Sequence, residues 1–135
     1  MARIHTQALV ARTKTVPAFA VKTFVTRAPK GTEAPYVVWH PAQGTNTQER
    51  FTGPRATKHP RFTGHIVGET ADQVQLLADL LEAALFPGGR GVLTVAGESV
   101  KNFWFESPLP LQVSTDPLPE VIYLVVECGW TADSL

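Results

Sequence analysis

The chain has 135 residues, no net charge at neutral pH, 44% hydrophobic residues and only 18% charged residues. This composition is that of a globular chain long enough for one domain with a buried core, and it excludes an intrinsically disordered protein. No apolar run approaches the ~20 residues needed to cross a bilayer, and the single cysteine excludes an intrachain disulfide, so we expect synthesis in a reducing cytosol.

Apolar spacing and proline positions divide the first 41 residues into three elements. Residues 3–14 have helix-compatible spacing and predict a short N-terminal helix, which Pro17 ends. Residues 19–25 are rich in β-branched and aromatic side chains and predict a strand. After a loop at 27–34, the apolar run 35–41 between two prolines predicts a buried strand.

Residues 42–61 are polar and basic, and we interpret them as an arm. Within this segment, 47–52 can form a strand that pairs back on 36–40. Residues 55–59 then form an exposed basic loop that leads into a strand at 62–67. Three antiparallel strands joined in this way form a meander.

The clearest element is a helix from about 70 to 86. Thr70 is placed as the N-cap, Gln73 completes a capping box, and Asp72 puts a negative charge in the first turn. The apolar face recurs at spacings of three and four residues: Val74, Leu77, Ala78, Leu81, Ala84 and Leu85. Pro87 ends the helix.

The last third of the chain predicts β structure. Two strands, 91–95 and 100–106, flank a turn at 96–99. The proline-containing segment 108–119 predicts an irregular connection, and 121–128 is the most β-prone run and predicts a central strand.

We expect the tail, residues 131–135, to be frayed. The fold class expected from these elements is α+β, in a single domain covering 1–135. A mostly antiparallel sheet is covered by the main helix at about 70–86 and by the short N-terminal helix.

No arrangement of residues in the sequence predicts catalysis or metal binding. The imidazoles of His5, His40, His59 and His65 form no helical pair and no metal-binding pattern. His65 and Cys128 could meet across neighbouring strands, although a hydrogen-bonded core histidine is the favoured interpretation. The glycine-rich turn at 87–91 follows a helix, which is the wrong order for a phosphate-binding loop. We therefore expect a protein that is not an enzyme and that binds no metal and no cofactor.

Charge is distributed unevenly along the chain. Residues 1–61 hold ten Lys or Arg and two acids, whereas residues 62–135 hold two Lys or Arg and ten acids. Either the halves interleave and their fields cancel, or the fold presents two oppositely charged faces that favour head-to-tail contact between copies. Both interpretations remain open from the sequence.

The order of these features resembles the tail terminator (minor tail, tail completion) proteins of long-tailed bacteriophages. The resemblance rests on the short N-terminal helix, the 34–41 run Ala-Pro-Tyr-Val-Val-Trp-His-Pro, and the 61–67 run Arg-Phe-Thr-Gly-His-Ile-Val. The helix opened by the 68–73 run Gly-Glu-Thr-Ala-Asp-Gln and the strand near Tyr123 complete it. It covers residues 3–130 and depends on order and spacing.

This resemblance implies a structural assembly protein of the virion, made in the host cytoplasm. Such proteins form a ring, usually of six copies, on the head-proximal end of the tail tube. The ring ends tube polymerisation, presents a surface for the head-completion or connector protein, and lets DNA pass without sequence-specific binding. Its partners are thus other copies of the chain, the tail tube protein and the connector, with no membrane.

Within this hypothesis, the basic arm is the candidate contact with a neighbouring copy or a tail partner. Its residues are Arg50, Arg55, Lys58 and Arg61. Two other functions compete with it. One is a head-completion or neck connector subunit, which shares the small α+β plan. The other is a cytosolic nucleic-acid-binding or ligand-binding domain, which the basic first half would serve.

Overall fold

The computed structural model describes residues 2–47, 57–87, 93–95, 97–114 and 121–134. In chain order the elements are helix α1 (Ala2–Thr13), the 3-10 helix η1 (Pro17–Phe19), β1 (Thr23–Val25), β2 (Tyr36–Thr47), β3 (Thr57–Gly68), helix α2 (Ala71–Leu85), β4 (Glu98–Glu106), β5 (Gln112–Ser114) and β6 (Val121–Ser134). Neither described helix is both long and apolar enough to span a membrane.

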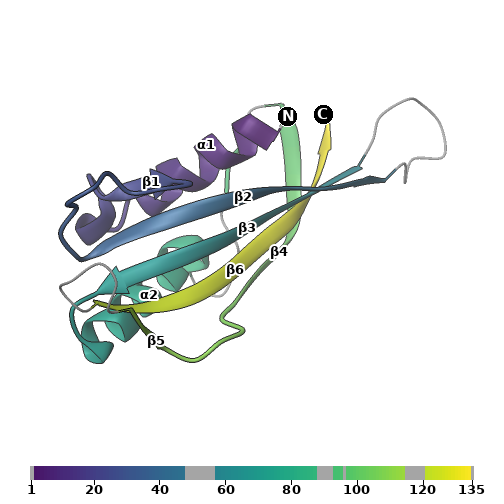
Figure 1. The fold of residues 1–135 in the computed structure, drawn as a ribbon. Coiled ribbons are helices and arrows are strands. Elements are labelled where there is room, and N and C mark those ends of the chain that lie inside the picture. The colour runs from purple at the N-terminus through teal and green to yellow at the C-terminus, as the bar shows by residue number, and fades with distance from the viewer. Residues whose placement is uncertain (1, 48–56, 88–92, 96, 115–120, 135) are drawn as a thin grey trace.

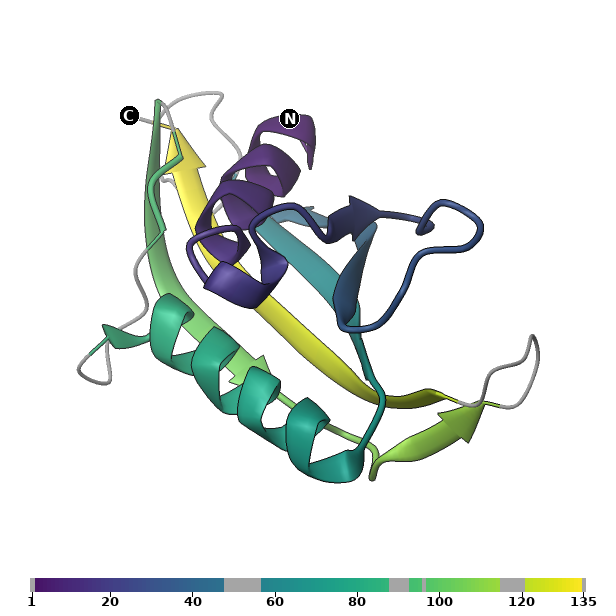
Figure 2. The ribbon, with the colours of Figure 1, turned by 90° about the vertical axis from the view of Figure 1, so that its left-hand side faces the viewer.

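The strands form one six-stranded sheet in the order β1-β2-β3-β6-β4, with β5 also paired to β6 (Figure 1). Only the β1–β2 pair is parallel. Both helices lie on the same face of the sheet, as Figure 2 shows, and no described helix covers the other face. The fold is therefore α+β with a mostly antiparallel sheet, as the sequence predicts.

The core lies between this sheet face and the helices, and it combines aliphatic side chains with a few large aromatic ones. Trp39 is fully buried and donates from Nε1 to Oγ1 of Thr13, 3.1 Å away, which fixes α1 against β2. Trp130 stacks between Phe62 and Phe103, with ring centroids 5.1 and 5.3 Å apart. Large rings from β2, β3, β4 and β6 therefore contribute apolar contact across the sheet.

Local sequence signals place α2 correctly. Thr70 is the N-cap, and its hydroxyl accepts a hydrogen bond from the backbone N–H of Gln73 at 3.1 Å. The Gln73 side chain accepts one in return from the backbone N–H of Glu69 at 2.8 Å. Four residues of the predicted apolar face are fully covered: Val74, Leu77, Leu81 and Leu85. The predicted helix is confirmed. It could be predicted because its N-cap and its apolar face both depend only on residues within or next to the helix.

The predicted meander in the first half is wrong. β2 continues to Thr47 and pairs directly with β3, from Tyr36 opposite Val67 to Thr47 opposite Thr57. The two strands thus form one long hairpin with an irregularity between Ala42 and Thr45. Most of the strand predicted at 47–52 lies outside the described residues. The strand predicted at 19–25 is shortened to β1, because Pro17–Phe19 form a turn of 3-10 helix.

The C-terminal predictions need three corrections. Residues 93–95 are not in a strand, and the remainder of the predicted 91–95 strand lies outside the described residues. The segment 108–119, predicted to be irregular, contains the short strand β5. The tail is not frayed to its end, because β6 runs to Ser134 and its Thr131 and Ala132 are buried between β3 and β4. The predicted central position of the 121–128 strand is confirmed.

Candidate subunit interface

The four basic residues predicted to form a contact arm do not share one environment. Arg50 and Arg55 lie outside the described residues. Lys58 and Arg61 are both in β3, but Lys58 is buried and Arg61 is exposed. The prediction of an exposed basic loop at 55–59 is therefore wrong for Lys58, which belongs to the strand.

Arg61 lies on the sheet face that no described helix covers. Its guanidinium carbon is 5.7 Å from the centroid of the Trp104 ring, a cation–π geometry. Trp104 in turn lies against Gly129, where a Cβ would come within 2.8 Å of the indole. The glycine leaves room for the indole beside β6, and the exposed Arg61 adds a positive charge next to Trp104.

Lys58 forms a buried ion pair with Glu98 of β4. The side chains keep only 8% and 4% of their exposure, so both charges are nearly removed from water. A lysine in a polar, basic stretch ordinarily lies in solvent, and its partner here is 40 residues away in sequence. Sequence reasoning missed the pair because the strand register that joins the two residues is set by distant elements.

His5 of α1 completes this buried cluster. Its Nδ1 accepts a hydrogen bond from Nε1 of Trp130 at 3.1 Å, and its Nε2 is 3.9 Å from Oε1 of Glu98. An accepting Nδ1 requires the neutral ring with its proton on Nε2. Burial lowers the pKa of His5, Glu98 opposes this shift, and Lys58 adds to it. The cluster therefore ties α1 to the ends of β3, β4 and β6.

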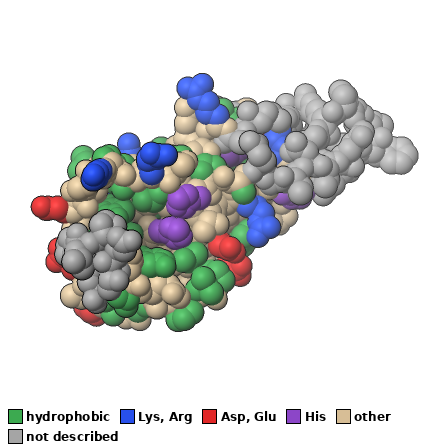
Figure 3. Space-filling view, in the orientation of Figure 1, with side chains coloured by type: hydrophobic (Ala, Val, Ile, Leu, Met, Phe, Trp, Pro, Cys, Tyr) green, Lys and Arg blue, Asp and Glu red, His purple; other side chains and the backbone are tan. Residues whose placement is uncertain are grey.

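Two histidines lie close together on the sheet face that no described helix covers. His40 and His65 come from neighbouring strands, and their ring centroids are 4.9 Å apart. Tyr123 of β6 lies 5.7 Å from His65. Burial lowers the pKa of His65, and the neighbouring His40 lowers it further. Figure 3 shows histidine side chains near the middle of this face, with apolar and charged groups around them.

The structure does not bring His65 to Cys128. His65 pairs in register with Val125, whereas Cys128 pairs with Phe62 on the opposite, helix-covered face. Burial raises the pKa of the Cys128 thiol far above its ordinary value, so the thiolate needed for nucleophilic chemistry does not form there. Within the described part of the chain, no group of three or more His, Cys, Asp or Glu is arranged to hold a metal ion.

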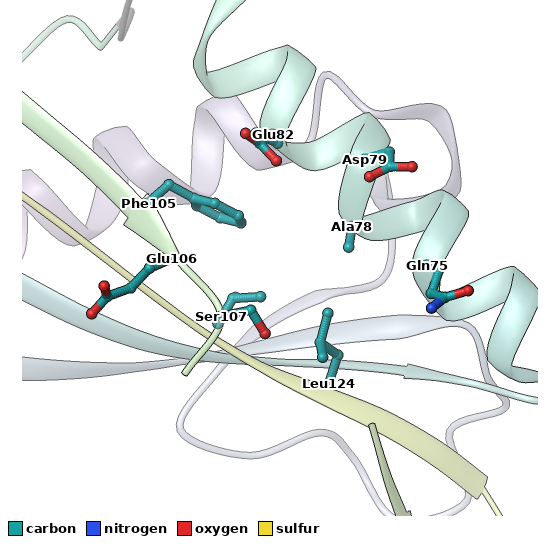
Figure 4. Close-up of a pocket in the computed structure, with 9 residues that line it drawn as sticks. Gln75, Ala78, Asp79, Glu82, Phe105, Glu106, Ser107 and Leu124 are labelled. Carbon is teal, nitrogen blue, oxygen red and sulfur yellow. The ribbon is translucent and has the colours of Figure 1, made fainter. Parts of the chain in front are cut away.

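A pocket of about 520 Å³ opens between α2, β4 and β6 (Figure 4). Its apolar side is formed by Ala78, Phe105, Leu124 and Val126. Asp79 and Glu82 of α2 supply its acidic side, whereas Glu106, which also lines the pocket, directs its carboxylate away from α2 in Figure 4. No Lys or Arg lines it. An apolar floor with an acidic rim fits an apolar group flanked by positive charge.

Exposed apolar side chains flank the pocket region. Leu76 and Leu80 lie one turn apart on α2 and are 56% and 43% exposed. Leu109 and Val113, near and within β5, are 49% and 58% exposed. Single exposed leucines are ordinary, but a repeated pair on one helix marks a surface suited to protein contact. In the sequence, Leu76 and Leu80 already lie off the main apolar face of α2, and this spacing indicates that both leucines are exposed.

Comparison with known proteins shows a shared fold. No protein-family model matches the sequence, and no curated protein matches it. Among solved structures, the fold is similar to that of a chain in the structure described as "Virion of native gene transfer agent (GTA) particle". The TM-score is 0.66 at 10% sequence identity, and the likeness covers 95% of this chain and 93% of that chain.

Proposed function

We propose that this protein is a structural component of a phage-like virion and acts as a tail terminator. Several copies, most simply six, form a ring on the head-proximal end of the tail tube. The ring ends tube polymerisation and presents the surface to which the head connector joins. The observation that carries the proposal is the fold match to a chain of a gene transfer agent virion over nearly the full length of both chains.

The sequence resemblance to tail terminators supports the finer assignment. Its elements occur in the structure as a helix α1, a buried strand β2 and a strand β3 that leads directly into a capped helix α2. The described surfaces also suit binding better than chemistry. They comprise the Arg61–Trp104 surface, the acid-rimmed pocket and the exposed leucines of α2.

The size of the chain is compatible with a ring around DNA. A compact chain of this length has a radius of gyration of about 14 Å, hence a diameter of roughly 37 Å. Six touching subunits leave a central opening about as wide as one subunit, which admits a duplex. A closed ring requires two different surfaces on each subunit that fit one another. The exposed Arg61 beside Trp104 and the acidic side of the pocket are candidates for these two surfaces.

Binding of the purified protein to isolated tail tubes and to portal-filled heads tests the assignment. A terminator binds one end of the tube and appears there as a ring in negative-stain electron micrographs. A neck connector subunit instead binds heads and leaves tube ends bare, and this result would overturn the terminator assignment. Incubation with tubes from an unrelated phage is the control for non-specific adsorption.

A further inference from the structure

We infer that the basic surface around β1 of one copy packs against the outward, acidic face of α2 in the next copy. This inference rests on the proposed ring and names the contact that joins its subunits. The sheet order puts β1 and β2 at one edge and β6 and β4 toward the other. Helix α1 contacts β1 and β2, whereas α2 contacts β3 and β6. The first part of the chain and α2 therefore occupy different sides of the molecule.

This arrangement keeps the uneven charge of the sequence apart in space. The described residues 2–47 include six Lys or Arg and a single acid, Glu33. The described residues 69–87 include four acids and no Lys or Arg. Figure 3 shows Lys and Arg side chains gathered at its upper left, where Figure 1 places β1 and α1. The subunit thus has a basic side and an acidic side.

The basic side carries exposed apolar groups at the edge of the sheet. β1 is the outermost strand, and β2 is its partner. Val21 and Val25 are 84% and 41% exposed. Arg27 and Lys30 are exposed in the loop that follows, and neither forms a salt bridge with a described residue. We call the surface formed by these four residues the β1 edge.

The outward face of α2 has the opposite charge and an apolar centre of its own. Leu76 and Leu80 are one turn apart and more than 40% exposed. Asp72 and Asp79 lie four residues before and three residues after Leu76, which places them on the same side of the helix. Both aspartates are exposed, and neither forms a salt bridge with a described residue. We call these four residues the outer α2 face.

The two surfaces fit each other better than either fits itself. A symmetrical contact between two β1 edges, or between two outer α2 faces, brings like charges together and is opposed by their repulsion. Pairing one surface with the other joins opposite charges and covers exposed valines with exposed leucines. The Arg61–Trp104 surface suits this contact less well, because Glu106 and Glu127 lie opposite each other on the same face of the sheet. The occupant of the outer α2 face is therefore the β1 edge of a second copy.

The positions of the two surfaces favour a ring. Figure 2 shows β1 at the upper right and α2 at the lower left, on opposite sides of the molecule. A subunit therefore does not cover its own outer α2 face with its own β1 edge. A contact between different surfaces of identical subunits is head-to-tail, and repetition of such a contact closes a ring when its rotation permits.

Disulfide trapping between two single variants tests the contact directly. Val21→Cys adds a thiol at the β1 edge, and Ala83→Cys adds one at an exposed position of α2, three residues after Leu80. The native Cys128 is buried and does not compete. The two full-length variants are mixed in equal amounts with tail tubes and oxidised, and mass spectrometry identifies the cross-linked heterodimer.

We expect at least about tenfold more of this heterodimer than in a matched control, because docking raises the local thiol concentration. The control replaces Val21→Cys with Ser99→Cys. Ser99 is also exposed, but it lies in β4 at the other edge of the sheet.

Charge reversal provides a second readout that does not depend on a thiol. Arg27→Glu with Lys30→Glu should raise the protein concentration needed to form rings on tube ends by about tenfold or more. Asp79→Lys with Glu82→Lys should do the same, since Glu82 is exposed one turn after Asp79. The four changes combined should restore ring formation, because the opposite charges again face each other.

Two choices in these variants separate the contact from effects on folding. Asp72 is kept, because its charge also stabilises the first turn of α2. The control for charge reversal is Glu106→Lys, since the Glu106 carboxylate points away from α2 in Figure 4 and its reversal should leave ring formation unchanged. Far-UV circular dichroism confirms that each variant folds.

The outcomes separate this inference from the proposed function. Rings on tail tubes without a 21–83 cross-link above the Ser99 control, or without recovery in the four-residue variant, would overturn the contact and leave the terminator assignment intact. Failure of the wild-type chain to associate with tail tubes at all would overturn the assignment, and the inference with it.

Discussion

Replacing Lys58 with methionine should cost the folded protein about 3–5 kcal/mol, because it leaves the carboxylate of Glu98 buried without its ion-pair partner. Glu98 retains only 4% side-chain exposure, and its Oε2 has no hydrogen-bond partner within the described residues. Nε2 of His5, on a neutral ring, lies 3.9 Å from Oε1 of Glu98. Methionine keeps the length of the lysine stem, so the loss measures the charge and not a cavity.

Urea unfolding followed by tryptophan fluorescence measures this effect, since Trp39 and Trp130 are buried. A loss of about 3–5 kcal/mol is at least about a fifth of the free energy of unfolding of an ordinary domain, which is about 5–15 kcal/mol. It lowers the midpoint without changing the slope with urea. The double variant Lys58→Met with Glu98→Gln removes both charges and should recover at least about half of the loss.

A loss below about 1 kcal/mol in Lys58→Met would refute the buried ion pair.

The expected result also affects any test of the basic arm. Alanine at Arg50, Arg55, Lys58 and Arg61 together would destabilise the fold through Lys58, so a loss of binding in that variant would not report on the interface alone. The proposed partner contact should therefore be tested with Arg50, Arg55 and Arg61 changed to Ala and Lys58 retained.

Three further substitutions test other parts of the structure. Gly64→Ala places a Cβ 2.7 Å from the buried indole of Trp39, so urea unfolding should show a loss of about 1–3 kcal/mol; unchanged stability would mean that the indole can move aside. His5→Asn keeps an acceptor for Trp130 but does not titrate. Burial lowers the pKa of His5 in the folded protein below its ordinary value of 6.5, so the unfolded chain binds the proton first as pH falls, and stability is lost from about pH 6.5 downward. Wild type should therefore lose more stability between pH 7 and pH 5 than the variant, and equal losses would contradict this. Thr70→Ala removes the N-cap of α2 and should cost about 1 kcal/mol in thermal unfolding, whereas Thr94→Ala, at an exposed residue outside the helices and strands, serves as the matched control.

The parts of the fold that the sequence predicts correctly are those whose causes are local. Thr70, Gln73 and the apolar face of α2 lie within one helix, and they place it to within a residue. The frayed tail predicted at 131–135 is wrong, because Ala132 is covered by β3 and β4, which are more than 25 residues away in sequence. Long-range pairing stabilises a strand end that has no local signal of its own.

The candidate interface was predicted in part for the same reason. The arginines of the arm were identified by charge alone, and Arg61 is indeed exposed. Lys58 carries the same charge, but its burial depends on Glu98, which only the fold brings close. The acidic pocket was not predicted, because Asp79 and Phe105 are 26 residues apart and line one pocket only when β4 lies beside α2.

Electron microscopy of particles assembled without this chain tests the central claim most directly. The account predicts overlong tails, or tails of normal width that are not joined to heads, and recovery when the wild-type chain is supplied in trans. Tails of normal length on normal heads in its absence would contradict the account.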